Sequence, residues 1–313
     1  IAITLPDSIL YQKSAVRPRD FIKSNYFQNY FKTALQDIYK SSKSFAILGH
    51  SRLVTNGNQN FHRNNQPVDS GGLLAVHNGI IVNQSDLWQS SDSLKRETDL
   101  DTEVMVQILS TKLSQNLDLP DAIRDTFQQT TGTISTAIAF EKLNCIAIAT
   151  NYGSLYILQD EAAQVFVFAS ERSTLETLIR TEVLGLTAKE SKIERVEADN
   201  AWIADLENFL MHPIDLRTED SKQITIHKKT RDIRDETPDS MRRDQVGPAL
   251  APKIKTDDLS RFEIDTRPIQ QLKRCRKCIL PETVPFIKFD NQGVCNFCNN
   301  HIPKTYYGRE ALE

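Results

Sequence analysis

The sequence comprises 313 residues, of which 39% are hydrophobic and 25% charged, and it carries a formal net charge of −3. This balance lacks the basic excess of a duplex-binding domain, so nucleic acid is not an expected partner. No apolar run reaches the roughly 18 residues of a membrane span, and the start at Ile1 lacks the features of an export signal. We therefore expect a cytoplasmic protein with no membrane partner.

Hydrophobic periodicity predicts the secondary structure in chain order. Apolar residues at i, i+3 and i+4 spacing predict a helix over residues 27–41, which leads into a short strand at 44–48. The apolar run 73–81 is predicted to be a strand interrupted by a tight turn at His77-Asn78-Gly79, because Asn-Gly favours turns. A helix is expected from Asp101, whose charge suits a helix start. One antiparallel meander of strands at 134–140, 145–150, 155–158 and 165–169 is then expected, followed by a helix at 175–184.

Composition divides the chain into three parts. The periodic elements end near residue 210, so we expect a first domain over residues 1–210. Residues 211–262 are rich in charge and proline and show no sustained period, which is typical of a linker. Residues 263–313 contain four of the five cysteines and are expected to form a separate small module.

Four segments, at residues 49–57, 65–68, 76–83 and 98–104, carry the polar residues that point to a function. They read GHSRLVTNG, NQPV, VHNGIIVN and TDLDTEV. In order and spacing they resemble the class-II glutamine amidotransferases of the N-terminal-nucleophile hydrolase superfamily. The resemblance implies an α+β fold, a four-layer αββα sandwich of two antiparallel sheets with helices outside.

The chemistry of glutamine hydrolysis assigns roles within these segments. A guanidinium is the group best shaped to bind the α-carboxylate, and Arg52 is the candidate. Asp101 is placed to bind the α-ammonium group. Asn78 and Gly79 supply a side-chain amide and a backbone N–H for the oxyanion of the tetrahedral intermediate. The resemblance implies the same assignments and adds Thr55 and Asn56 as walls of the pocket.

The catalytic nucleophile is the main departure from the resemblance. Members of the family begin with a cysteine whose thiolate attacks the amide and whose own amino group moves the proton. This chain begins with Ile1 and has no cysteine before Cys145, which reads as a small buried hydrophobe. Either a first strand bearing that cysteine is missing from the sequence, which we expect, or the domain is inactive. His50 and His77 are interpreted as structural.

Two Cys-x-x-Cys pairs, Cys275/Cys278 and Cys295/Cys298, are separated by sixteen residues. Two such pairs suit a closed tetrahedral Zn²⁺ site in a reducing compartment better than disulfides, so we expect a structural zinc ribbon. Residues 275–295 resemble the opening of the N-acetyl-sugar amidotransferases, in which this motif precedes an ATP-pyrophosphatase domain. That domain, with its ATP and Mg²⁺, would follow residue 313.

Two functions are compatible with these patterns. The first is the glutaminase domain of a glutamine-dependent amidotransferase, which passes ammonia to an ATP-dependent synthetase or sugar amidotransferase domain, as in asparagine-synthetase-like proteins. The second is an inactive, amidotransferase-like binding or scaffold domain with a structural zinc module. The segment 69–72 superficially resembles a phosphate loop but is interpreted as a surface turn.

Overall fold

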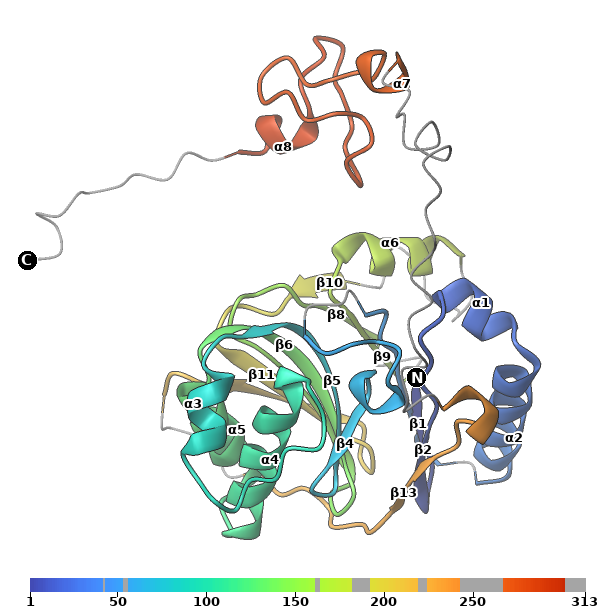
Figure 1. Cartoon of the computed structure of the whole chain (residues 1–313), viewed down its shortest axis with the longest axis vertical. Helices are drawn as coiled ribbons and strands as arrows, with labels where there is room; N and C mark the ends of the chain where they lie inside the picture. Colours follow the sequence, from blue (N-terminus) through green and yellow to red (C-terminus); the bar gives the residue numbers. More distant parts are fainter. Residues whose placement is uncertain are drawn as a thin grey trace, which may run out of the picture. The chain divides into compact units, whose positions relative to one another are not determined.

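The computed structural model describes residues 1–41, 43–52, 56–160, 164–181, 192–218, 224–242 and 267–301. The chain divides into two compact units, Ile1–Pro248 and Ala249–Glu313 (Figure 1). Within the described ranges, no helix combines the length and the apolar character needed to cross a bilayer.

The largest element of the first unit is a six-stranded sheet in the order β12-β11-β7-β6-β5-β4, with every neighbouring pair antiparallel. Helices α4 (Asp101–Ser114) and α5 (Leu119–Gln129) cover one of its faces (Figure 1). The core between them is built from buried aliphatic side chains of helix and sheet. The strands are β4 (Val68–Ser70), β5 (Leu73–Ile81), β6 (Gly132–Phe140), β7 (Cys145–Thr150), β11 (Asn200–Asp205) and β12 (Leu210–Asp215).

A four-stranded sheet in the order β13-β2-β1-β3 faces the other side of the six-stranded sheet. Its own outer face packs against α2 (Asn25–Ser41), where Phe27 and Tyr30 bury their rings (Figure 1). At the amino end of the chain, β1 lies in this sheet between two antiparallel partners, and the expectation of a further strand ahead of Ile1 stays a prediction. The strands are β1 (Ala2–Thr4), β2 (Ser8–Tyr11), β3 (Ala46–Leu48) and β13 (Asp232–Asp235).

A third sheet, in the order β10-β8-β9, is small and packs on α6 (Arg172–Thr181). Its strands are β8 (Tyr156–Asp160), β9 (Val165–Ala169) and β10 (Lys192–Arg195). The predicted single meander is therefore wrong, because β6 and β7 belong to the six-stranded sheet and β8 and β9 do not. Short apolar strands with polar turns look alike in sequence whichever sheet they join.

The predicted boundary at residue 210 also differs from the structure. Strand β12 pairs along its length with β11, and β13 pairs in parallel with β2. Between them, the buried Arg231 donates to the carbonyl oxygens of Leu5, at 2.9 Å, and Leu143. The described residues up to 242 are thus part of the first unit. Their backbone pairs with strands of both larger sheets, although their side chains are rich in charge.

The remaining short elements connect these layers. They are α1 (Pro18–Lys23), the 3₁₀ turns η1 (His62–Asn64) and η2 (Asp239–Met241), and α3 (Gln84–Gln89). In the described part of the second unit, residues 267–301, the helices are α7 (Arg267–Gln270) and α8 (Asn296–Asn299).

Candidate functional site

A cleft of about 570 Å³ opens at the amino end of β1. One wall comes from the residues after β2 and from α1, and the other from residues 49–52 and the loop 56–66, which we call the cleft loop. The charged side chains among the described lining residues are Lys13, Arg17 and Arg52, all cationic. This lining favours an anionic group such as a carboxylate.

Arg52 is held against the cleft loop by backbone oxygens. Its guanidinium donates to the carbonyl oxygens of Asn64, Asn56 and Gly57, the last at 3.2 Å. Burial lowers the pKa of Arg52 below its ordinary value, and the charge of Asp101 partly offsets this effect. Three carbonyl partners fix the plane of the guanidinium without neutralising it, so the cation stays available to a ligand.

We call the three carbonyl oxygens that hold Arg52, those of Asn56, Gly57 and Asn64, the carbonyl shelf. This shelf is anchored at Asn64, which is completely buried. Its side-chain amide donates to Asp99 Oδ2 at 2.8 Å, and its Oδ1 accepts from the Asp99 backbone amide at 3.0 Å. This reciprocal pair joins the cleft loop to the segment that leads into α4. The position of Arg52 therefore depends on residues far from it in sequence.

Asp101 is the first residue of α4 and is 4% exposed. Its Oδ2 accepts a hydrogen bond from the backbone amide of Ile81 at 2.7 Å, which ties the helix start to the end of β5. The second carboxylate oxygen has capacity for a further donor. Burial lowers the pKa of Arg52 and the negative charge of Asp101 acts to raise it, so the side chains of Arg52 and Asp101 are close enough to interact electrostatically.

Asn78 and Gly79 do not form the predicted turn, because β5 runs without interruption through both residues. Gly79 has φ 141°, and a Cβ atom there would lie 1.8 Å from the carbonyl oxygen of Thr133 on β6. Glycine is required for this close approach of two backbones. Asn78 is exposed beside it, two residues before the strand reaches Ile80.

The structure brings together some of the predicted site residues. Arg52 lines the cleft, and Asn56 contributes its carbonyl oxygen to the guanidinium. Asp101 contacts the end of β5 at Ile81, on the strand that also carries Asn78 and Gly79, and none of these residues is part of the cleft lining. Thr55 lies outside the described residues. The roles assigned to these residues stay predictions.

His50 is partly exposed and lines the cleft, whereas His77 is buried within β5. His77 is 3% exposed, with Nδ1 3.1 Å from Thr102 Oγ1 and Nε2 3.3 Å from the carbonyl oxygen of Thr133. Burial lowers the pKa of His50 to about 4, against a smaller effect from a hydrogen bond with the backbone of His77. His77 is packed among structural partners, whereas His50 lines the cleft, and the interpretation of both as structural stays a prediction.

Gln66 was not predicted to have a role, although its segment was part of the resemblance. Its side-chain amide donates to the carbonyl oxygen of His77 at 2.8 Å, and its Oε1 accepts from the His77 amide at 2.6 Å. Gln66 thereby joins the cleft loop to β5. A glutamine beside a proline in a polar segment gives no sign of such a partner, because the two positions become neighbours only in the folded chain.

The second unit brings its four cysteines together. The Sγ atoms of Cys275 and Cys298 are 3.8 Å apart, those of Cys278 and Cys295 are 3.6 Å apart, and all four lie within 4.8 Å of one another. A tetrahedral zinc thiolate site has sulfur separations near ~3.7 Å. The backbone amide of Cys295 points at the Cys275 sulfur, 3.2 Å away. This cluster could hold a metal ion. In the first unit, Cys145 is 1% exposed within β7.

Comparison with known proteins places this geometry in context. Residues 50–177 match the family model of the glutamine amidotransferase domain. The matched stretch contains Arg52, the cleft loop, the Asn78-Gly79 pair and Asp101. The match and the relatives below support a class-II glutamine amidotransferase domain in this part of the chain.

The relatives are large enzymes of which the chain covers a small part. Glutamine–fructose-6-phosphate aminotransferase (isomerizing) of Caulobacter vibrioides is 30% identical over 122 residues, which are 38% of this chain and 20% of that protein. The enzyme of the same name from Bartonella henselae is 32% identical over 108 residues, 34% of this chain and 18% of that protein. The chain thus spans about a fifth of the length of these relatives.

Two solved structures are similar to part of the chain. The glutamine phosphoribosylpyrophosphate amidotransferase from B. subtilis, complexed with ADP and GMP, is 23% identical, with a TM-score of 0.40 over 53% of this chain and 34% of that chain. A glutamine aminotransferase class-II domain protein from Silicibacter pomeroyi is 14% identical, with a TM-score of 0.33 over 48% of this chain and 70% of that chain.

Proposed function

We propose that the first unit is the glutaminase domain of a glutamine-dependent amidotransferase. The observation that carries the proposal is the half-buried Arg52 guanidinium, which lies in the matched region and is oriented by backbone carbonyls in a cationic cleft. We assign the fold to the four-layer αββα sandwich. The cores between α4 and the six-stranded sheet, between the two larger sheets, and between the four-stranded sheet and α2 support this assignment.

In the proposed mechanism the two ends of glutamine are bound by opposite charges. Arg52 takes the α-carboxylate, and the oxygen of Asp101 that Ile81 leaves open takes the α-ammonium group. Asn78 and Gly79 stabilise the oxyanion as the amide carbon becomes tetrahedral. Asn56 is proposed to form part of the pocket wall, and the same role for Thr55, outside the described residues, stays a prediction from the resemblance.

The cysteine that attacks the amide must also provide the base that accepts its thiol proton, and this base is its own free amino group. A cysteine joined directly or through one residue to Ile1 would bring a thiol and a free amino group to the cleft, because Ile1 lines it. Attack of the thiolate on the amide carbon forms a thioester and releases ammonia with a proton from the amino group. Water then cleaves the thioester to glutamate. The ammonia is proposed to pass to an ATP-dependent synthetase or sugar amidotransferase domain, in the same longer chain or in a partner.

Glutamine binding provides the first test. Isothermal titration calorimetry of residues 1–313 with L-glutamine is expected to show one site, and Arg52→Ala is expected to weaken it at least about tenfold, as loss of a charged hydrogen-bonding partner does. Arg63→Ala is the matched control, because this exposed arginine stands on the same loop and its guanidinium lies over the ring of Phe61. Absence of glutamine binding by the unaltered chain would refute the proposal.

Ammonia release distinguishes the enzyme from the alternative. A chain extended with Cys-Gly ahead of Ile1 is expected to release ammonia from glutamine, and the Ser-Gly extension is not. The alternative is an inactive binding or scaffold domain. Glutamine binding without ammonia release by the Cys-Gly chain would select it.

For the second unit we propose a structural Zn²⁺ bound by Cys275, Cys278, Cys295 and Cys298. The sulfur separations and the closed, four-thiolate set support a structural ion, since a catalytic zinc keeps an open position. A unit of this size buries little apolar surface, so the metal would supply a large part of its folding energy. Its proposed place is ahead of an ATP-binding domain that uses Mg²⁺.

A further inference from the structure

The segment 232–242, which we call the return segment, brings the last described part of the first unit back to the cleft. It runs parallel to β2 and continues beyond it, where the Glu236 amide donates to the Tyr11 carbonyl oxygen at 2.8 Å. Gln12 Nε2 donates to the Glu236 carbonyl oxygen at 3.0 Å. The return segment is therefore fixed beside the residues that form one wall of the cleft.

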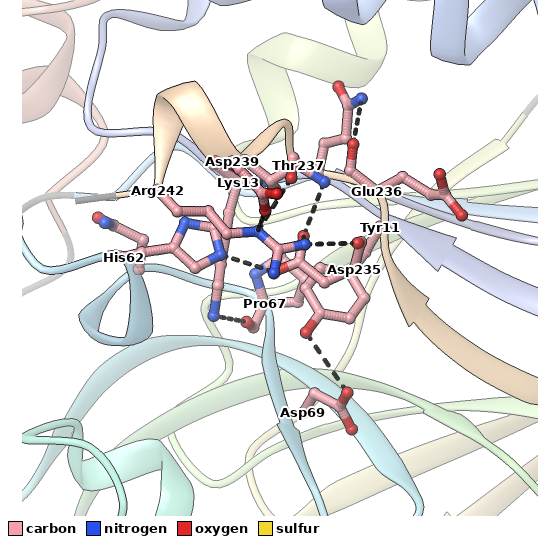
Figure 2. Close-up of polar contacts among 12 residues, drawn as sticks. Tyr11, Lys13, His62, Pro67, Asp69, Asp235, Glu236, Thr237, Asp239 and Arg242 are labelled. Carbon is pink, nitrogen blue, oxygen red and sulfur yellow. Dashed lines mark hydrogen bonds and ion pairs between the residues drawn. The ribbon is translucent and has the colours of Figure 1, made fainter. Parts of the chain in front are cut away.

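From the return segment, Asp235 reaches across to the other wall. Its Oδ2 lies 2.6 Å from His62 Nε2, and the two side chains are only 16% and 9% exposed (Figure 2). Its Oδ1 accepts from the backbone amide of Thr237 at 2.9 Å, which orients the carboxylate. Arg242 Nη2 donates to the Asp235 backbone oxygen at 2.8 Å. Both carboxylate oxygens are thus committed, and the contact to His62 is sheltered from water.

His62 opens the η1 turn of the cleft loop, and this turn ends at Asn64. The Asn64 carbonyl oxygen is one of the acceptors that hold the Arg52 guanidinium. A continuous set of contacts therefore runs from Asp235 through His62 and the η1 turn to Arg52. Asp235 and His62 are 173 positions apart in sequence. Their contact therefore attaches the cleft loop to a distant part of the chain.

We infer that His62 and Asp235 are positioning residues that set the affinity of the cleft for glutamine by fixing the carbonyl shelf on which Arg52 rests. The inference rests on the proposed function. It assigns a role in substrate binding to the return segment, which sequence composition had assigned to a linker. Loss of either partner frees the η1 turn, and the guanidinium then loses the orientation that a carboxylate needs.

The test is a double-mutant cycle on glutamine affinity, measured by calorimetry on residues 1–313. His62→Ala and Asp235→Asn are each expected to weaken the affinity about tenfold, and the double variant about as much as one of them, because both remove one interaction. Arg234→Ala is the control, since this arginine lies next to Asp235 with its side chain 52% exposed and is expected to leave the affinity unchanged.

Hydrogen exchange gives a readout that does not depend on glutamine. In Asp235→Asn, peptides covering 56–66 are expected to exchange faster while those of α4 keep their protection. If a variant with alanine at position 62 fails to fold, His62→Gln replaces it in the cycle. Unchanged affinity in both single variants, effects that add in the double variant, or unchanged exchange of the cleft loop would overturn the inference. Failure of the unaltered chain to bind glutamine would instead refute the proposed function and remove the basis of the inference with it.

Discussion

Gln66 and His77 exchange two hydrogen bonds, so that a side-chain amide on the cleft loop pairs with the backbone of β5 as a neighbouring strand would. The pair holds one wall of the cleft at a fixed distance from the strand that carries Asn78 and Gly79. Removing the side-chain amide leaves a buried backbone N–H and a carbonyl oxygen without their partner, which is the costly way to break a hydrogen bond.

Gln66→Ala is accordingly expected to lower the free energy of unfolding by about 1–3 kcal/mol. Gln66→Glu tests the donor alone, because the carboxylate can still accept from the His77 amide but cannot donate to its carbonyl oxygen. Urea unfolding followed by circular dichroism measures both. Gln59→Ala serves as the control, since this glutamine is exposed on the same loop. Equal stability of all four proteins would contradict the structural role of the pair.

Gly79→Ala is expected to disrupt the pairing of β5 with β6. The new Cβ would lie 1.8 Å from a carbonyl oxygen of the partner strand, and the residue has φ 141°. A clash with backbone cannot be relieved by a rotamer change, so a loss of more than about 3 kcal/mol of stability is expected. Gly49→Ala is the matched control, because nothing lies within 4 Å of the corresponding Cβ position. A Gly79→Ala protein as stable as Gly49→Ala would show that the strand can shift.

The partly buried His50 predicts a loss of stability in mild acid. Burial lowers the pKa of its imidazole from 6.5 to about 4, so between these values the unfolded chain binds more protons than the folded one. Stability should be fully present above pH 6.5 and fall as the pH is lowered towards 4, by no more than about 3 kcal/mol from this group. Urea midpoints of His50→Gln, compared at pH 7 and pH 4.5 with those of the unaltered chain and of His212→Gln, measure the effect. An unaltered pH dependence in His50→Gln alone would speak against it.

Metal removal should affect the second unit and leave the first intact. Protein purified without chelator is expected to contain one equivalent of zinc by mass spectrometry, and Cys295→Ser is expected to lose it, because a thiolate ligand is removed from a four-ligand site. Cys145→Ala should retain full zinc content, since this thiol lies in the first unit. Chelation should unfold residues 267–301 as seen by exchange while α2 and β5 stay protected. Less than half an equivalent in the unaltered protein would contradict the site.

Periodicity located the long elements well. The helix predicted over 27–41 is α2, at Asn25–Ser41, and the helix predicted from Asp101 begins there as α4. Apolar residues recur at helical spacing in both, although α4 is buried over most of its length. The spacing of the cysteines likewise predicted a cluster that the structure forms.

Periodicity does not predict which residues far apart in sequence contact each other in the folded chain. Asn-Gly at 78–79 was predicted as a turn because local preference favours one, whereas a neighbouring strand makes glycine necessary within β5. β13 was missed because its exposed side chains are charged and its strand identity comes only from pairing with β2. The contact of His62 with Asp235 has no local signature at all, since each residue is ordinary in its own segment.

The parallel pairing of β13 with β2 also constrains how the chain acquires its structure. Strands β1, β2 and β3 all come from the first 48 residues, but their sheet is completed by residues 232–235. During synthesis this edge must wait until most of the first unit has left the ribosome, and such non-local closure slows folding. An exposed β2 edge during that interval is a site where another chain can pair. Nascent chains stalled before residue 232 should therefore be the ones that associate with chaperones or with one another.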